Sequence, residues 1–184
     1  MGNLDRSLLY LINTLGSTHW LDLFFPAVTD LHKSPYFALV VVPLFLGLFL
    51  WHYKKKGLWI FLGLILCLGL TDFTGGQIKK AVGRPRPGDT ADVGVTVRSA
   101  YGGFSFPSNH ASNLFALATY SSYFVPQLSW PTFMVASLVA YSRVYNGVHY
   151  PSDVLFGAFL GILIGYLSCL CINRFFRWKD GRWY

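Results

Sequence analysis

Glutamate is absent from this chain of 184 residues, and its eight acidic residues are all aspartates. Charged residues make up only 12% of the sequence, whereas soluble globular domains contain about 25%. A soluble domain of this length would need far more polar surface to stay in solution. Intrinsic disorder is also excluded, because 53% of the residues are hydrophobic and can be buried. The composition therefore indicates an integral membrane protein.

Cysteine and basic residues are sparse as well. The three cysteines lie inside apolar runs, and their odd number argues against a disulfide framework or a metal site. The net charge is +7, but the cations form short runs rather than the basic face of a nucleic-acid-binding protein. Two of these runs, Lys54–Lys56 and the C-terminal Arg174, Arg177, Lys179 and Arg182, flank apolar stretches. Such placement predicts a cytoplasmic C-terminus and no nucleic-acid partner.

Long apolar runs are what the sequence has in abundance. A helix that crosses the hydrocarbon needs about 20 mostly apolar residues. Five runs are candidates: Tyr36–Tyr53, Gly57–Val82, Ser108–Val125, Trp130–Tyr145 and Val154–Asn173. We therefore predict an all-α integral membrane protein with one domain over residues 1–184 and about five transmembrane helices. Glycines at four-residue spacing in the last run (Gly157, Gly161 and Gly165) permit close helix contact, within a monomer or in a dimer.

The first 34 residues follow a different pattern. Apolar residues recur there at helical spacing, which predicts a helix lying in the membrane interface; they are Leu4, Leu8, Leu11, Ile12 and Leu15. Trp20–Leu31 is apolar but short, and both a sixth span and a re-entrant segment remain open for it.

Polar and ionisable residues gather in three segments near the ends of the predicted spans. These segments are Lys79–Pro87, Phe106–His110 and Ser142–Asp153. Because successive spans run in opposite directions, all three segments are expected at the same membrane face. Ionisable residues are costly in such an apolar chain, so their convergence predicts a functional site.

The residue types in these segments suit a phosphate group. Lys79, Arg86 and Arg143 supply the ammonium and guanidinium donors that bind tetrahedral oxyanions. Ser108 and Asn109 stand at a predicted helix start, where free backbone N–H groups favour an anion. The segments therefore predict a phosphate-binding site.

Two histidines accompany the predicted phosphate site. Covalent phosphoryl transfer needs one group that attacks phosphorus and one that protonates the departing oxygen, and His110 and His149 are candidates for these two roles. Asp153 follows His149 by four residues and could accept a hydrogen bond from its ring. Asp72 lies two helical turns before Lys79. It has three open roles: pairing with Lys79, orienting it through neighbours, or packing against another span.

Together, the three segments resemble the signatures of the type 2 phosphatidic acid phosphatase (PAP2) superfamily. The family pattern is a Lys, six residues and Arg-Pro; then Pro-Ser-Gly-His; then Ser-Arg, five residues, His, three residues and Asp. Here Lys79 precedes Arg86-Pro87, and Pro107-Ser108-Asn109-His110 follows. Ser142-Arg143 then precedes His149 and Asp153 at the family spacing. One departure is Asn109, which stands where the pattern has glycine.

The resemblance implies a membrane-bound helical bundle that hydrolyses lipid phosphates without a metal or other cofactor. It implies that His149 forms a phosphohistidine, that His110 is the general acid, and that Asp153 orients His149. The implied phosphate ligands are Lys79, Arg86, Ser108, Arg143 and the backbone of Asn109. Arg84 lies outside the strict pattern, and we expect it to be a secondary phosphate or headgroup contact.

Several points stay open from sequence. The substrates acted on by small enzymes of this kind are undecaprenyl diphosphate, phosphatidylglycerol phosphate and the 1-phosphate of lipid A. A lipid phosphotransferase using the same phosphohistidine is one alternative, and a non-enzymatic lipid-binding membrane protein is another. We expect a monomer or a weak dimer in a bacterial inner membrane, with the site at the periplasmic face.

Overall fold

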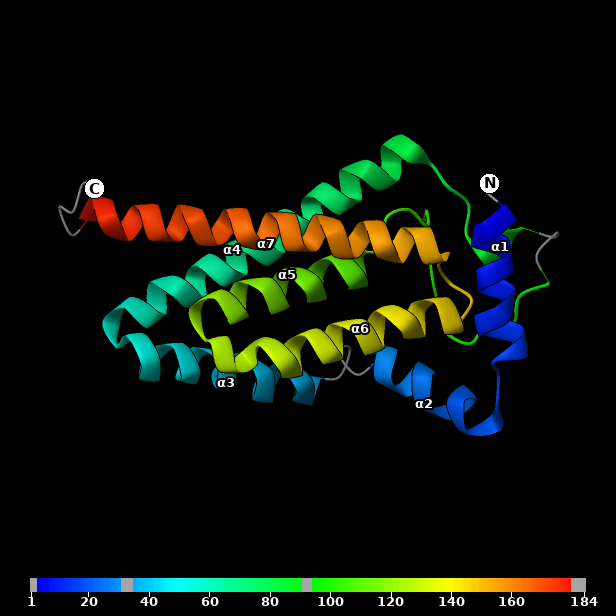
Figure 1. Ribbon diagram of the computed structural model, residues 1–184, viewed down its shortest axis with the longest axis horizontal. Helices are drawn as coiled ribbons and strands as arrows, with labels where there is room; N and C mark the ends of the chain where they lie inside the picture. The colour runs from blue at the N-terminus through cyan, green and yellow to red at the C-terminus, as the bar shows by residue number, and fades with distance from the viewer. Residues whose placement is uncertain (1–2, 31–34, 91–93, 180–184) are drawn as a thin grey trace.

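The computed structural model describes residues 3–30, 35–90 and 94–179, and no strand occurs in that part of the chain. Each of the five predicted apolar runs is a helix whose limits lie within a few residues of the prediction (Figure 1). They are α3 (Pro35–Tyr53), α4 (Lys55–Val82), α5 (Asn109–Phe124), α6 (Ser129–Tyr145) and α7 (Pro151–Lys179). The prediction of an all-helical fold is confirmed.

Local sequence signals explain where the helices begin and end. Pro35 opens α3, since the first turn of a helix does not need the N–H that proline lacks. Helix α4 ends at Gly83, whose φ of +62° is the left-handed conformation that glycine adopts at low cost. Pro126 follows α5 and opens the short 3-10 helix η5 (Pro126–Leu128).

Two of these helices, α4 and α7, are long and apolar enough to cross a membrane, and α3 contains a shorter apolar stretch, Leu39–Tyr53. Helix α5, with 16 residues, is shorter and more polar. It packs against α4, α6 and α7, so polar residues such as Ser112 and Ser121 are buried among helices rather than exposed to lipid. The five-span count remains a prediction.

The glycine stripe of α7 lies against α5. A Cβ atom at Gly157 would lie 2.6 Å from the carbonyl oxygen of Ser108, and one at Gly165 would lie 2.9 Å from that of Ala116. At Gly161, between them, a Cβ would collide with the carbonyl of Ser112. The stripe therefore serves helix contact within one chain, which was one of the two possibilities left by the sequence.

The N-terminal segment is helical and packs against the end of the bundle, in contact with α6 and α7. Helix α1 (Asn3–Tyr10) runs across the end of the bundle where α7 begins, followed by the π-helical turn η1 (Leu11–Leu15) (Figure 1). Leu4 and Leu15 are exposed whereas Leu9 is buried, as suits a helix with one face on the protein and another in the interface. Helix α2 (His19–Asp30) has 12 residues and a length of about 18 Å, too short to span the hydrocarbon.

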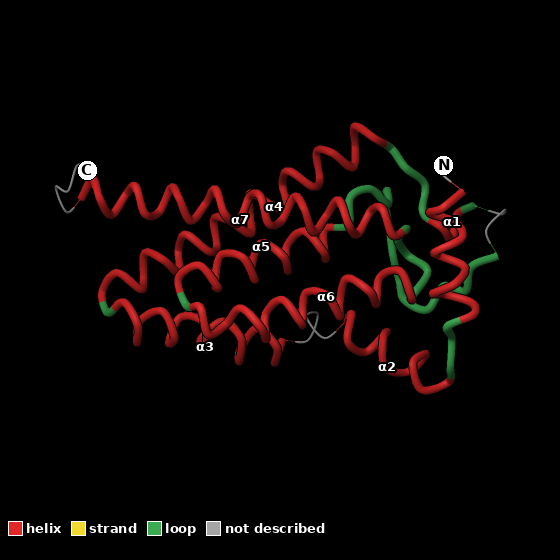
Figure 2. The backbone as a smooth tube through the Cα atoms, viewed as in Figure 1, coloured by secondary structure: helices red, strands yellow, loops and turns green. Residues whose placement is uncertain are grey.

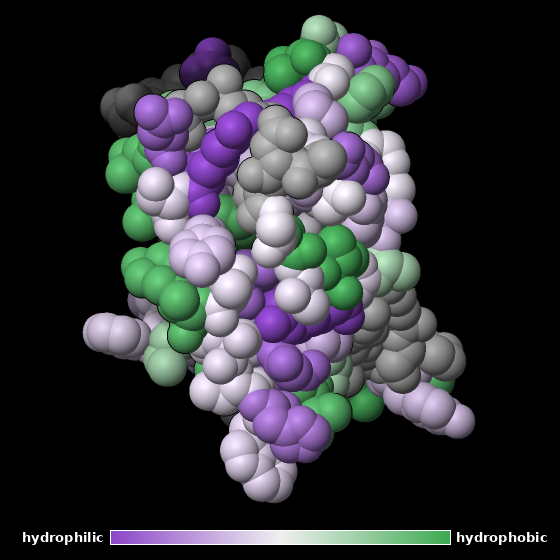
Figure 3. All heavy atoms as spheres, turned by 90° about the vertical axis from the view of Figure 1, so that its right-hand side faces the viewer, coloured by the Kyte–Doolittle hydropathy of each residue, from purple (hydrophilic) through white to green (hydrophobic). Residues whose placement is uncertain are grey.

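The long connections gather at that same end of the bundle (Figure 2). They include the loop after α4, which contains the 3-10 helix η3 (Pro87–Asp89), and the turn between α6 and α7. Seen end-on, this face carries many hydrophilic side chains (Figure 3). At the opposite end, Lys56 lies 5.4 Å from the ring centre of Phe176, so the α3–α4 turn and the end of α7 are neighbours. The three polar segments thus share one end, as predicted.

Candidate active site

A cavity of about 400 Å³ opens at this end of the bundle. Its lining comes from all three polar segments and the long loop: Lys79, Arg86, Ala100, Tyr101, Gly102, Asn109, His110, Arg143 and His149. Three of these residues are cations, and none of the lining residues just named is acidic. A cavity with this lining favours an anion of multiple negative charge, such as a phosphate group.

His149 lies at the wall of the cavity and is 2% exposed. Its Nδ1 is 3.4 Å from Oδ2 of the fully buried Asp153, and its Nε2 is 3.2 Å from Nη1 of Arg86. A guanidinium can only donate, so Nε2 accepts and the ring proton sits on Nδ1, directed at Asp153. This tautomer leaves the nucleophilic lone pair of the imidazole on Nε2.

The pKa of His149 lies well below its ordinary value. Burial is the main cause, and the positive charges of Arg86, Arg143 and Lys79 lower the pKa further. The imidazole is therefore neutral at physiological pH, which is the form that can attack phosphorus.

Arg86 holds the wall of the cavity in place. Its Nε and Nη2 donate to the carbonyls of Gly103 and Gly102 at 3.0 and 2.9 Å, and its Nη1 donates to the carbonyl of Val148 at 2.8 Å. The same guanidinium therefore joins the long loop to the backbone beside His149. It fixes both the cavity and His149.

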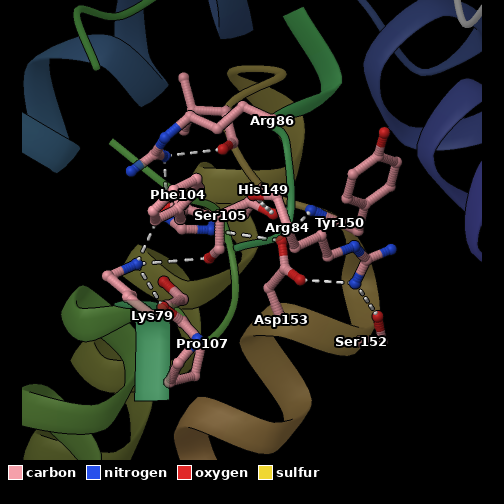
Figure 4. A network of polar contacts seen from close by, with 12 residues as sticks. Lys79, Arg84, Arg86, Phe104, Ser105, Pro107, His149, Tyr150, Ser152 and Asp153 are labelled. Atoms are coloured by element: carbon pink, nitrogen blue, oxygen red, sulfur yellow. Dashed lines mark hydrogen bonds and ion pairs between the residues drawn. The ribbon is translucent and has the colours of Figure 1, made fainter. Parts of the chain in front are cut away.

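Lys79 extends from the last turn of α4 toward the loop that precedes α5. Its Nζ donates to the carbonyls of Phe104 and Pro107 at 3.1 and 2.5 Å (Figure 4). These bonds keep the ammonium at the border of the cavity, and they attach the start of α5 to α4. The sequence left open a pairing of Lys79 with Asp72. In the structure, Lys79 instead binds these loop carbonyls.

Arg143 reaches the cavity from the last turn of α6 and is 4% exposed. Its Nη1 donates to the hydroxyl of Thr29 at 3.0 Å, and the same hydroxyl accepts a bond from Ser142 at 3.0 Å. Thr29 belongs to α2, so the N-terminal segment holds the guanidinium of Arg143, a candidate phosphate ligand, in place.

The start of α5 borders the cavity through Asn109 and His110. Ser108 precedes the helix and donates its backbone N–H to the carbonyl of Asp153 at 3.0 Å. Its hydroxyl is buried, makes no hydrogen bond within the described residues, and does not cap the helix. A buried hydroxyl without a partner at a helix N-terminus is suited to an anion.

Asn109, the departure from the family pattern, is accommodated by α4. Its side-chain Nδ2 donates to Oδ1 of Asp72 at 2.9 Å, and Asn113 donates to the same oxygen at 3.3 Å. A Cβ at Gly75 would lie 2.8 Å from the amide oxygen of Asn109, so a larger residue there would require this side chain to shift. Asp72 therefore orients Asn109 rather than Lys79.

Arg84 differs from the expectation. It does not line the cavity. Its guanidinium binds Asp5 through Nη2 at 2.6 Å. It binds Asp153 through Nη1, also at 2.6 Å (Figure 4). The geometry therefore does not show the expected phosphate or headgroup contact. Asp153 and Ser108 lie behind the residues that line the cavity.

Four further residues belong to this site and were not predicted: Asp5, Thr29, Tyr101 and Ser152. Asp5 and Thr29 come from the N-terminal segment, at least 79 residues from the site groups that they contact. Tyr101 lines the cavity, its ring centre lies 5.3 Å from the Arg86 guanidinium, and its hydroxyl donates to Asp89. An isolated aspartate, threonine or tyrosine carries no spacing signal, so none was detectable from sequence.

The charges around His149 predict a shift in the pH dependence of activity on Arg143→Gln substitution. Removing one cation raises the pKa of His149, because the protonated ring is then repelled less. The acid limb of kcat/KM, measured in detergent micelles with a lipid phosphate that the wild-type protein hydrolyses, should therefore move to higher pH. The substrate phosphate also titrates near pH 6, but it does so equally for both enzymes. An unmoved limb, or one at lower pH, would contradict this electrostatic role.

Comparison with known proteins agrees with this geometry. The chain is 31% identical to the lipid A 4'-phosphatase of Bacteroides thetaiotaomicron, over 91% of this chain and 76% of that protein. It is 33% identical to phosphatidylglycerophosphatase B of Bacillus subtilis, over 80% of this chain and 73% of that protein. The crystal structure of Aquifex aeolicus LpxE superposes with a TM-score of 0.75 at 30% identity, covering 91% of this chain and 95% of the other. The fold and site therefore define a phosphatase of the membrane type.

Residues 57–177 match the family described as the PAP2 superfamily. The chain belongs to this superfamily, and it is a hydrolase of the PAP2 type. The resemblance seen in the three sequence segments is confirmed.

Proposed function

We propose that this enzyme hydrolyses the phosphate monoester or diphosphate of a membrane lipid through a phosphohistidine on His149. The observation that carries the proposal is the cavity itself. It combines three cations with a neutral imidazole whose Nδ1–H faces a buried carboxylate. Such an arrangement suits nucleophilic attack on an anionic phosphoryl group.

In the first step, the lone pair on Nε2 of His149 attacks phosphorus, and the bond from phosphorus to the lipid oxygen breaks. His110 gives its proton to the departing oxygen. Lys79, Arg86 and Arg143 stabilise the charge on the three equatorial phosphoryl oxygens. Asp153 stabilises the positive charge that develops on the ring of His149.

In the second step, water attacks the phosphohistidine and the phosphorus–nitrogen bond breaks. His110, now neutral, accepts the proton of that water, so it ends the cycle protonated as it began. Inorganic phosphate leaves, and Nε2 of His149 recovers its lone pair. No metal enters either step.

The position of the cavity suits a substrate that stays in the membrane. With α3 to α7 as spans, the cavity lies at the membrane surface, and a headgroup enters it while the acyl chains remain in hydrocarbon. Lys54–Lys56 lie at the opposite end, together with the basic end of α7. By the positive-inside rule, that end is cytoplasmic and the site faces the periplasm of a bacterial inner membrane.

The relatives suggest substrate classes to compare. Those named above are a lipid A 4'-phosphatase and a phosphatidylglycerophosphatase. Lipid A phosphates and phosphatidylglycerol phosphate are therefore candidates, and undecaprenyl diphosphate is a third. Asn109 and the loop over residues 88–103, which contributes Tyr101 to the cavity, are the groups placed to distinguish them.

A phosphate-release panel tests the proposed function. The purified protein in detergent is given lipid A, phosphatidylglycerol phosphate and undecaprenyl diphosphate, with and without excess EDTA. We expect inorganic phosphate from at least one lipid at a rate that EDTA leaves unchanged, with inhibition by vanadate, which mimics pentacoordinate phosphorus. Release from none of them, loss of activity in EDTA, or phosphorylation of an acceptor lipid without free phosphate would contradict the proposal.

A further inference from the structure

A carboxylate of the N-terminal helix binds the active-site end of α7. Oδ1 of Asp5 accepts the backbone N–H of Ser152 at 2.9 Å, and Oδ2 accepts its hydroxyl at 2.5 Å. The first N–H groups of a helix have no partner within the helix. Asp5 therefore caps α7 from a helix that is distant in sequence.

The same carboxylate binds Arg84. Nη2 of Arg84 lies 2.6 Å from Oδ2 of Asp5. Its Nη1 donates to Oδ1 of Asp153 at 2.6 Å and to the hydroxyl of Ser152 at 2.7 Å (Figure 4). The guanidinium also stacks on Tyr150, 4.0 Å from the ring centre. Both terminal nitrogens of the guanidinium, Nη1 and Nη2, bind carboxylates. These contacts explain why Arg84 does not line the phosphate cavity.

Asp153 divides its two oxygens between this network and the nucleophile. Oδ1 faces Arg84, whereas Oδ2 accepts the backbone N–H of Tyr150 at 2.9 Å and lies 3.4 Å from Nδ1 of His149. The plane of the carboxylate is thus set by Arg84 on one side and by the backbone on the other. Any rotation about its side chain would alter the bond to His149.

The network formed by Asp5, Arg84 and Asp153 is largely buried, which restricts the movement of its side chains. The side chains of Arg84 and Asp5 are 14% and 13% exposed, and that of Asp153 is fully buried. Burial raises the pKa of Asp5, but hydrogen bonds from Arg84 and Ser152 more than offset this and hold it below its ordinary value. Asp5 is therefore ionised, and Arg84 lies between two carboxyl groups in a site partly screened from water.

We propose that Asp5 is a positioning residue of the active site, acting through Arg84 to fix Asp153 and hence His149. Helix α1 is then a functional part of the enzyme as well as an interfacial helix. The proposal rests on the proposed function, because it assigns Asp5 to the phosphohistidine chemistry.

The test uses Asp5→Asn, which keeps the shape of the side chain but replaces one acceptor oxygen by a donor. In one orientation this donor meets Nη2 of Arg84, and in the other it meets the backbone N–H of Ser152. In both orientations Arg84 loses the negative charge that Asp5 supplies. We expect kcat to fall about 10-fold, a typical loss when a group that orients a reacting centre is removed, with KM changed less than about twofold. The substrate is the lipid of the release panel that the wild-type enzyme hydrolyses fastest.

Asp22→Asn is the matched control. Asp22, in α2, also joins the N-terminal segment to the bundle through an arginine, because it lies 2.7 Å from Nε of Arg98 and accepts a bond from the hydroxyl of Tyr145. It makes no contact with Asp153 or Arg84. A kcat within about twofold of wild type is expected for this variant, whereas a loss equal to that of Asp5→Asn would overturn the proposal.

A double-mutant cycle with Arg84→Gln separates positioning from general destabilisation. If Asp5 acts through Arg84, adding Asp5→Asn to Arg84→Gln lowers kcat no further. Rates are referred to folded protein, and Asp5→Glu takes the place of Asp5→Asn in the cycle where the latter does not fold. An additive loss, or an unchanged kcat in the single variant, overturns the role of Asp5 and leaves the proposed function intact. Failure of the wild-type enzyme on every lipid overturns both.

Discussion

Replacement of His149 by alanine is expected to abolish phosphate release, with a loss of kcat of about 10⁴-fold or more. In the proposed mechanism the imidazole of His149 supplies the lone pair that attacks phosphorus. Within the described cavity lining the only other imidazole is that of His110, which the proposal makes the general acid. Water attack without the covalent intermediate would retain only the contribution of the binding cations. Phosphate release per folded protein is the measurement.

His52→Ala is the control for this substitution. His52 is exposed near the end of α3, where its Nδ1 contacts the carbonyl of Leu48, away from the cavity. The same chemical change there should leave kcat within about twofold of wild type. Thermal unfolding in detergent establishes that both variants fold. Undiminished turnover by folded His149→Ala would contradict the proposed mechanism.

The second large effect is on stability and concerns Gly161. An alanine Cβ at this position collides with the carbonyl of Ser112 in α5, where a rigid backbone cannot yield as a flexible side chain would. Helices α5 and α7 must then separate, at a cost of about 3 kcal/mol. The melting temperature in detergent should fall by roughly 6 to 12 °C for a chain of this size.

Gly69→Ala provides the matched comparison for this effect. Gly69 lies in α4, and a Cβ built there meets no atom within 4 Å. Alanine has the higher helix propensity, so this variant should be as stable as the wild type or more stable by up to about 1 kcal/mol. Equal melting temperatures for the two variants would show that the α5–α7 contact is not as close as described.

The separation of α5 and α7 also affects the site. Ser108, at the start of α5, donates its backbone N–H to the carbonyl of Asp153 in the first turn of α7. This bond lies close to the glycine stripe, because Gly157 faces Ser108. Close packing of the two helices thus holds the start of α5 beside the carboxylate that orients His149.

Much of this arrangement could be predicted from sequence because its determinants are local or periodic. Apolar runs and prolines gave the positions of the five long helices, and the alternation of span direction placed three polar segments at one end. Motif spacing brought Lys79, Arg86, Arg143, His110 and His149 to a common cavity. These features depend on patterns that a single sequence contains.

Other features depend on contacts between distant segments, and no pattern in the sequence reports them. Arg84 looked like another phosphate ligand because it is a cation beside Arg86, yet two carboxylates bind it. Asp72 looked like a partner for Lys79 on the same helical face, but loop carbonyls bind Lys79 and amides bind Asp72. For both Arg84 and Asp72, the side chain binds groups that only the tertiary structure brings close.

Identifying the residue that carries the phosphoryl group during turnover is the most direct test of the proposed chemistry. The enzyme is mixed with radioactively labelled lipid phosphate, quenched during turnover, and digested under alkaline conditions that preserve a phosphorus–nitrogen bond. The label is expected on the peptide that contains His149, stable to alkali and labile to acid, and absent from His149→Ala. Label on another residue, or no labelled protein from an enzyme that is releasing phosphate, would contradict the phosphohistidine at His149.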